Sequence, residues 1–239
     1  MIIMRNKIIY LLAIALGIAG TACQQNGAVQ NAKLETATDS ASYAIGFLVG
    51  SNNKQQLASA PGGKEMNIET MAAAFRTASL GEDGLITEEE ANTIIRNYFE
   101  SANKREAQEN LEKGNAFLEQ NKTREGIHVT DNGLQYEVLT EGTGSKPTAD
   151  DQVRVHYHGT LIDGTVFDSS VDRGEPAVFK VGQVIPGWTE ALQLMPVGSK
   201  WKIYLPADLA YGERGAGNDI GPNSVLIFEV ELLEIVKDK

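Results

Sequence analysis

An aspartate beside a large aromatic residue is the most unusual pairing in this sequence. Phe167 and Asp168 follow the tight-turn dipeptide Asp163–Gly164 and end a predicted β-hairpin. Core packing alone would favour an aliphatic residue next to the phenylalanine, because a buried carboxylate needs polar partners. The pair therefore indicates a site that holds a polar group beside an apolar ring.

The first strand of this hairpin is predicted from the alternation of apolar and polar residues. Between Val153 and Tyr157 every second residue is apolar, which is the pattern of a strand with one buried face. In a fully extended return strand, Phe167 and Asp168 would point to opposite faces. A site that uses both side chains therefore requires a β-bulge at this point.

Three later segments add apolar residues to the predicted sheet. A short helix is predicted to follow residues 184–188 and to end at Pro196. Strands are predicted at 201–205 and 225–235. The helix has one apolar stripe at positions i, i+3, i+4 and i+7, made of Trp188, Ala191, Leu192 and Met195. This stripe is expected to face the sheet.

Four motifs occur in a characteristic order, and the sequence from about Gly126 to Val236 carries them. They are HYHGTL…DGTVFDSS, VIPGW, AYG and FEVELL. In order and spacing they resemble the FK506-binding protein (FKBP) family of peptidyl-prolyl cis–trans isomerases. The resemblance implies an antiparallel half-barrel wrapped on a short helix. With the helical N-terminal region described below, the expected fold class is α+β.

The activity implied by this resemblance requires no nucleophile, cofactor or metal. Rotation about an X–Pro bond has a barrier of about 18–20 kcal/mol, which arises from lost amide resonance. A site that favours the twisted amide over both planar forms is sufficient. A dry aromatic pocket favours the twisted amide, because the twisted amide has less charge separation than the planar forms. His156 and His158 share a strand face but have no third metal ligand nearby in sequence.

The resemblance also assigns the residues of the pocket. Trp188 is expected to form its floor, and the backbone N–H of Ile185 to hold a substrate carbonyl. Asp168 and Tyr211 are expected to orient the peptide, while aromatic residues form walls around the proline ring. The complete expected set is Tyr157, Phe167, Asp168, Phe179, Val184, Ile185, Trp188, Tyr211, Ile220 and Phe228.

The first residues of the chain have the pattern of an export signal. Two basic residues precede an apolar run at 8–19, which is shorter than the roughly 20 residues of a membrane span and typical of a signal peptide at 1–22. Cys23, the only cysteine, follows as in bacterial lipoproteins, where the thiol is lipidated. The alternative is ordinary signal cleavage with an incidental free thiol. Gln24 is not the aspartate associated with inner-membrane retention, which by analogy predicts a periplasmic protein anchored to the outer membrane.

The charge of the chain limits its partners. The formal net charge is −11, from 21 Lys plus Arg and 32 Asp plus Glu. Removal of residues 1–22 takes away two basic residues, which leaves 19 against 32 and a net charge of about −13. This balance argues against nucleic acid or an anionic membrane surface as a partner, so membrane association is expected through the lipid anchor only.

The region between the signal and the catalytic motifs is predicted to be helical. Residues 23–38 read as a flexible tether, and helices are predicted at 39–58 and 68–80. A capping box formed by Thr87 and Glu90 is expected to begin a third helix that continues to about Asn121. Such a helix would be about 50 Å long.

The apolar residues of the third helix are unevenly distributed. They are dense near Ile94 and Ile95 and sparse among charges later, so the front half is expected to pack and the rear half to be mostly solvated. Two short helices cannot cover so long a face, which predicts a homodimer through residues 39–121. The alternative is a charged helix folded back on its own catalytic domain. The layout resembles the dimerisation domain of the macrophage-infectivity-potentiator type of bacterial FKBPs.

Four segments are therefore expected: a signal peptide at 1–22, a lipid-anchored tether at 23–38, a helical dimerisation domain at 39–125 and an isomerase domain at 126–239. The expected function is a peptidyl-prolyl isomerase that assists the folding of exported, proline-containing unfolded or nascent proteins. The alternative is a non-catalytic chaperone that binds through the pocket and the dimer cleft. Since every expected pocket residue follows Gly126, the isomerase domain alone is expected to turn over short peptides nearly as well as the whole protein.

Overall fold

The structure is a computed structural model that describes residues 32–236. The predicted signal peptide, Cys23 and most of the tether lie outside the described residues. The chain divides after Gly50 into two compact units. Within residues 32–236, no helix is both long enough and apolar enough to cross a membrane.

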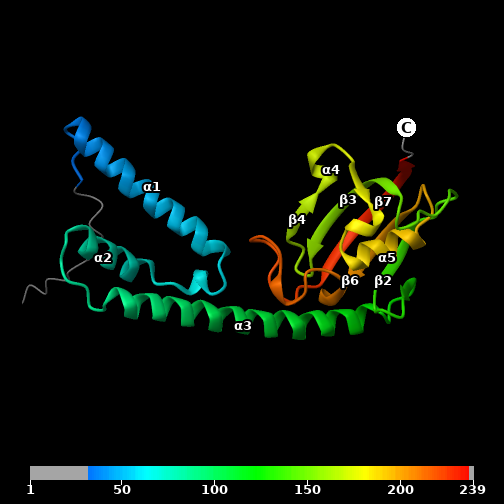
Figure 1. The fold of residues 1–239 in the computed structure, drawn as a ribbon, viewed down its shortest axis with the longest axis horizontal. Coiled ribbons are helices and arrows are strands. Elements are labelled where there is room, and N and C mark those ends of the chain that lie inside the picture. Colours follow the sequence, from blue (N-terminus) through cyan, green and yellow to red (C-terminus); the bar gives the residue numbers. More distant parts are fainter. Residues whose placement is uncertain (1–31, 237–239) are drawn as a thin grey trace, which may run out of the picture. The chain divides into compact units, whose positions relative to one another are not determined.

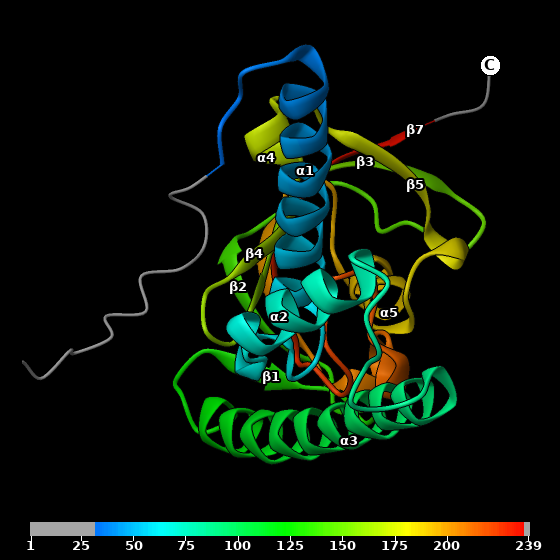
Figure 2. The ribbon, with the colours of Figure 1, turned by 90° about the vertical axis from the view of Figure 1, so that its left-hand side faces the viewer.

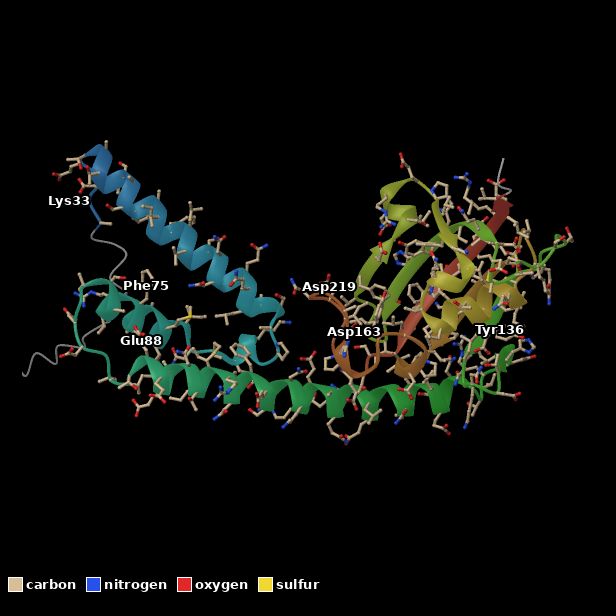
Figure 3. The ribbon with its side chains drawn as sticks, viewed as in Figure 1. Lys33, Phe75, Glu88, Tyr136, Asp163 and Asp219 are labelled. Carbon is tan, nitrogen blue, oxygen red and sulfur yellow. The ribbon has the colours of Figure 1, made fainter. Side chains whose placement is uncertain are left out.

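Three helices precede the sheet (Figure 1): α1 (Ala37–Ser59), α2 (Ile68–Ser79) and α3 (Glu88–Asn121). Helices α2 and α3 begin where their capping residues predict, whereas α1 begins at Ala37, two residues before the predicted start. The Asn67 side chain accepts a hydrogen bond from the Thr70 N–H at 3.0 Å. Thr87 and Glu90 form the expected capping box at the start of α3, where Figure 3 labels Glu88.

Large apolar side chains remain exposed on all three helices. No residue of α1 or α2 is buried among the described residues. Near the start of α3, Ile94 and Ile95 are each 54% exposed. Further exposed apolar residues are Tyr43, Ile45, Phe47, Leu48, Ile68 and Phe75. Each of these helices therefore carries large apolar side chains that the described residues of its own unit leave exposed.

The rear half of α3 packs one narrow face on the sheet domain, while most of its residues are exposed, as the sequence predicts. Leu118 forms a small buried cluster with Tyr204 and Val225. The buried Asn121 side chain donates a hydrogen bond to Gln135 Oε1 at 2.8 Å. Few apolar residues suffice here because the contact uses one narrow face of the helix, from Asn110 to Asn121, and includes hydrogen bonds of side-chain amides. The alternative, a helix folded back on its own catalytic domain, holds for this end of α3.

The remaining elements form one antiparallel sheet with two short helices (Figures 1 and 2). The strands have the order β1-β2-β6-β7-β3-β4, and β5 pairs with β3 beside β4. Their bounds are β1 Ile127–Val129, β2 Gln135–Thr140, β3 Gln152–Leu161, β4 Val166–Ser169, β5 Ala177–Lys180, β6 Lys200–Leu205 and β7 Leu226–Val236. The helices are α4 (Ser170–Arg173) and α5 (Pro186–Leu194).

The core of this sheet domain forms where α5 lies on the sheet. The predicted stripe is buried in full, since Trp188, Ala191, Leu192 and Met195 are all at most 4% exposed. From the sheet, alternate residues of β3 and β7 complete the core, for example Val153 and Leu232 at 0% exposure. An antiparallel sheet wrapped on a short helix is the expected architecture.

Candidate active site

A cleft of about 730 Å³ opens on the sheet domain. All ten residues expected at the pocket line it: Tyr157, Phe167, Asp168, Phe179, Val184, Ile185, Trp188, Tyr211, Ile220 and Phe228. Four residues that the sequence did not single out complete the lining: Gln183, Ala216, Gly217 and Asp219. The fold thus brings together side chains that are up to 71 positions apart in the chain.

Trp188 is the shared contact of the aromatic residues in the cleft. Pro186 occupies the first position of α5, which places Trp188 in the first turn, 4% exposed. The rings of Tyr157, Phe179 and Phe228 lie edge-to-face with the indole at centroid distances of 5.4, 5.6 and 5.2 Å. Edge-to-face packing is a favoured geometry of aromatic pairs, so these four rings form one apolar surface.

The β-bulge that the sequence requires is present in β4. Gly159 is paired with Asp168 and Thr160 with Val166, so Phe167 has no partner in the register. The bulge allows Phe167 and Asp168 to line the same cleft. A side chain at Gly159 would lie 2.8 Å from the rings of Phe167 and Phe228, so glycine is required opposite the bulge.

The carboxylate of Asp168 is held by two neighbours. The Tyr157 hydroxyl donates to Asp168 Oδ2 at 2.5 Å, and Arg173 donates to Asp168 Oδ1. Arg173 also donates to the Tyr157 hydroxyl at 2.8 Å, with its guanidinium 5.6 Å from the centre of the tyrosine ring. The partly buried carboxylate of Asp168 therefore has the polar partners that the sequence required, a tyrosine and an arginine.

Sequence reasoning also missed Arg173, which holds the carboxylate from outside the cleft lining. It lies at the end of α4, a single turn whose N-cap Ser169 accepts a hydrogen bond from the Asp172 N–H at 3.1 Å. The available signal was an arginine five residues after a costly aspartate, with a capping serine between them.

These contacts shift the pKa values of the three groups. Burial is the largest effect on Asp168 and raises its pKa, but the hydrogen bonds from Tyr157 and Arg173 and the arginine charge outweigh it and leave the pKa below its ordinary value. Burial also raises the pKa of Tyr157, and so does its hydrogen bond to the carboxylate. The hydrogen bond to Tyr157, followed by that to Asp168, raises the pKa of Arg173. At neutral pH the site therefore holds an ionised carboxylate, a neutral phenol and a charged guanidinium.

One unpaired backbone donor lies at the start of α5. Ile185 is the N-cap residue, and its carbonyl accepts from the N–H groups of Trp188 and Thr189 at 2.9 and 3.1 Å. Its own N–H has no acceptor within residues 32–236. The Thr189 hydroxyl donates to the Val181 carbonyl at 2.7 Å, which fixes this end of the helix. A fixed N–H without an acceptor, beside an apolar surface, can donate a hydrogen bond to the carbonyl of a ligand.

A small hairpin closes one side of the cleft. The backbones of Ala216 and Ile220 exchange two hydrogen bonds, at 2.8 and 3.1 Å, and Ile220 is 9% exposed. We call residues 216–220 the flap; Figure 3 labels Asp219 on it. Tyr211, which precedes the flap, is 42% exposed at the cleft.

A sheet wrapped on one helix, with an aromatic cleft and a bound carboxylate at the junction, defines an FKBP-type rotamase. Residues 143–233 match the family described as FKBP-type peptidyl-prolyl cis-trans isomerase. Residues 38–138 match the domain amino terminal to FKBP-type peptidyl-prolyl isomerase. The chain belongs to the FKBP-type peptidyl-prolyl cis–trans isomerase family, and it is an enzyme of that class.

Relatives from several bacteria match most of the chain. It is 46% identical over 212 residues to the outer membrane protein MIP of Legionella longbeachae, covering 85% of this chain and 88% of the relative. It is 48% identical over 205 residues to the FKBP-type 22 kDa peptidyl-prolyl cis-trans isomerase of Escherichia coli strain K12, covering 84% and 97%. The crystal structure of FkpA from Escherichia coli is similar with a TM-score of 0.63 and 31% identity, covering 85% and 98%. The predicted α+β fold class and isomerase activity are thereby confirmed.

Proposed function

We propose that the cleft binds the proline ring of a substrate and stabilises the X–Pro bond in its twisted form. Tyr157, Phe167 and Phe228 act as walls of this site, and Trp188 acts as its floor. The observation that carries the proposal is the convergence of all ten predicted residues on one cleft. The apolar surface favours the twisted amide because it carries less charge separation than the planar forms.

The polar groups at the rim orient the peptide in this proposal. The free Ile185 N–H receives a substrate carbonyl and so fixes one side of the bond that rotates. An ionised carboxylate has about four acceptor sites, and Tyr157 and Arg173 occupy one on each oxygen of Asp168. The remaining sites face the substrate amide. The arginine and the tyrosine hold the carboxylate in place, so that its position needs no reorganisation during rotation.

A protease-coupled proline-isomerisation assay on short peptides tests these roles. We expect Asp168→Ala to lower kcat/KM about tenfold or more, and Phe228→Ala to do the same, with an unchanged circular-dichroism spectrum. Val178→Ala is the matched control, because Val178 lies next to Phe179 in β5 and is 42% exposed. Unchanged turnover in the folded Asp168 variant removes that residue from the mechanism. Binding of peptides without turnover by the wild type would instead support the non-catalytic chaperone.

The proposed clients are exported, proline-containing proteins that are unfolded or newly made. Two observations support export of this protein. Residues 1–22 resemble a signal peptide, and the similar Legionella protein is named an outer membrane protein. We assign the protein to the periplasm, with an acylated Cys23 as its anchor to the outer membrane. Metabolic labelling with a fatty-acid probe should mark the wild type and not Cys23→Ser. Label that persists in the serine variant, or is absent from both proteins, leaves a merely exported protein.

Residues 39–125 form a dimerisation domain in this proposal, and residues 126–239 form the isomerase domain. The exposed apolar side chains of α1, α2 and the front of α3 support a second copy of the chain as the partner. Two clefts in one dimer raise the effective concentration of sites for a client with several prolines.

A further inference from the structure

We propose that helix α3 is a positioning element of the isomerase cleft, because it anchors the segment that follows the flap. Residues 221–225 connect the flap to β7, and we call them the anchored segment. The inference rests on the proposed cleft, since Ile220 of the flap lines it. Figures 1 and 2 show this part of the chain, coloured orange, beside α3.

Two side-chain amides join the helix to the anchored segment in opposite directions. Asn110 Nδ2 of α3 donates to the Pro222 carbonyl at 2.9 Å. Asn223 Nδ2 donates to the Ala107 carbonyl at 3.2 Å. Both hydrogen bonds are partly buried and join residues more than 110 positions apart. Because each segment donates one of the two hydrogen bonds, the pair fixes the position of the anchored segment along the helix axis as well as its distance from the helix.

The backbone at Asn223 is held in an unusual conformation. Its φ is 56°, and it is the only non-glycine residue with a positive φ in the part of the chain that the structure describes. The Asn223 N–H donates to the Gly212 carbonyl at 2.9 Å, which ties the segment to the loop before the flap. Glycine adopts this conformation at no steric cost. Asparagine at this position therefore supplies a side-chain amide that glycine lacks, and this amide contacts α3.

Small residues allow the close approach of the helix and the anchored segment. A Cβ on Gly114 of α3 would lie 2.7 Å from Val225 Cγ2, and Val225 is 5% exposed. A Cβ on Gly221 would lie 2.5 Å from Glu106 Oε1. Glycine is a poor helix former, so its presence in the middle of α3 is explained by this contact.

The position of the flap depends on these contacts. Ile220 is separated by one residue from Pro222, and its only partner across the flap is Ala216. A hairpin held by two backbone hydrogen bonds opens readily unless its ends are fixed. One end is fixed on α3, so the cleft wall formed by Ile220 takes its position from a helix outside the isomerase domain. The expectation that the isomerase domain alone works nearly as well as the whole protein changes accordingly.

The test uses the full-length mature protein and measures both the flap and the catalysis. Asn110→Ala and Asn223→Gly each remove one amide, and the glycine retains the positive φ. Asn103→Ala is the control on the same helix, since Asn103 is exposed and its side chain makes no hydrogen bond within residues 32–236. Hydrogen exchange is followed at the amides of Ala216 and Ile220, and kcat and KM are measured on a short proline peptide.

We expect faster exchange at both flap amides in the two variants, with unchanged protection in β3 and β7. We expect kcat/KM to fall about three- to tenfold, mainly through KM, because a lost hydrogen bond shifts an equilibrium by about that factor. The control variant should match the wild type. Gly114→Ala sharpens the test, because alanine stabilises the helix itself while it displaces Val225. It should loosen the flap without lowering the helix content.

Two results overturn the proposal. Unchanged exchange at Ala216 and Ile220 in both variants means that α3 does not hold the flap. Faster exchange with unchanged kcat and KM means that the flap position does not matter for catalysis. Failure of the cleft assignment gives a different pattern, in which Phe228→Ala leaves turnover unchanged while the flap amides still respond to Asn110→Ala. In that pattern α3 still holds the flap, but the proposed cleft is not the catalytic site, so the proposed effect of α3 on catalysis fails.

Discussion

The sheet domain and the helices that precede it differ in how their apolar residues are used. In the sheet domain, residues such as Val153, Val155 and Leu232 are 0% exposed around α5. In the helices, Phe47 and Phe75 are 64% and 51% exposed. Single exposed apolar residues are ordinary, but many on neighbouring helices mark a surface for association. The sheet domain thus completes its own core, whereas the helices keep large apolar side chains exposed.

Helix α3 has both exposed and buried apolar residues. Its front half carries the exposed Ile94 and Ile95, and its end is buried through Leu118 and Asn121. Between them, Asn110 contacts the anchored segment after the flap. We therefore propose that the functional division of the chain falls within α3, so that the helix links the proposed dimer surface to the cleft.

The largest expected effect is on the core of the sheet domain. Trp188→Ala should lower the free energy of unfolding by about 3–5 kcal/mol, because the ring is 4% exposed and fills the space between three other rings. Activity should fall as well. Urea unfolding monitored by circular dichroism gives the free energy, and Trp188→Leu is the control that should retain far more of it. Equal midpoints for the wild type and the alanine variant contradict a buried floor.

The parts of the fold that the sequence predicted are those that depend on local patterns. The turn at Asp163–Gly164 needs a glycine with positive φ, and Gly164 has a φ of 86°. The stripe of α5 and the capping box of α3 are likewise set by residues within two turns of one another. The bulge at Phe167 could be inferred because two side chains had to share one face.

The features that the sequence did not predict depend on polar contacts between distant segments. The docking of the end of α3 uses the amide pair of Asn121 and Gln135, which a count of apolar residues does not detect. The anchored segment is held by Asn110 and Asn223, which are ordinary surface residues by type. Arg173 acquires its role only after the bulge and the turn of α4 place it beside Asp168. Periodicity reports burial, and it does not report which polar groups meet.

An intermediate effect is expected for the helices, and it should appear in association and not in the turnover of short peptides. Ile94→Glu places a charge on the exposed apolar face of α3. In a symmetric dimer both copies carry the change, and each loses about 1.5–3 kcal/mol of apolar burial. The dimer dissociation constant should therefore rise at least about a hundredfold. Asn92→Glu adds the same charge at an exposed position on nearly the opposite side of the helix from Ile94 and serves as the control.

Light scattering after size exclusion measures this effect, and activity assays show its limits. The monomeric Ile94→Glu variant should turn over short peptides like the wild type, because the flap contacts of α3 lie further along the helix. It should suppress the aggregation of an unfolded protein less well at equal cleft concentration. A monomeric wild-type mature protein would end the dimer proposal. A variant that dissociates yet suppresses aggregation fully would separate dimerisation from the handling of clients.

The smallest expected effect concerns two carboxylates, one in each region, whose pKa values are lowered by different causes. In the helical region, the pKa of Glu90 is lowered by a local cause, first the backbone hydrogen bond from Thr87 and then its hydroxyl. In the cleft, the lowered pKa of Asp168 depends on hydrogen bonds from Tyr157 and Arg173 that overcome the raising effect of burial. The first is built into one helix turn, and the second depends on the tertiary structure.

Arg173→Gln separates these two cases. Without the arginine charge, burial at Asp168 is opposed mainly by Tyr157, so the pKa of Asp168 should rise from below 3.8 toward or above that value. A carboxylate with a lowered folded-state pKa stabilises the protein above its unfolded-state pKa, and this contribution is lost as pH falls through the folded-state pKa. The variant should therefore lose activity at a higher pH than the wild type on acidification, and its stability should lack the acid-dependent loss that Asp168 gives the wild type. At pH 7 its kcat/KM should fall by less than about fivefold, because the ion pair is half exposed. Carbon NMR titration of the carboxyl groups should show the shift at Asp168 and none at Glu90, and an unmoved Asp168 midpoint would show that Arg173 does not control this carboxylate.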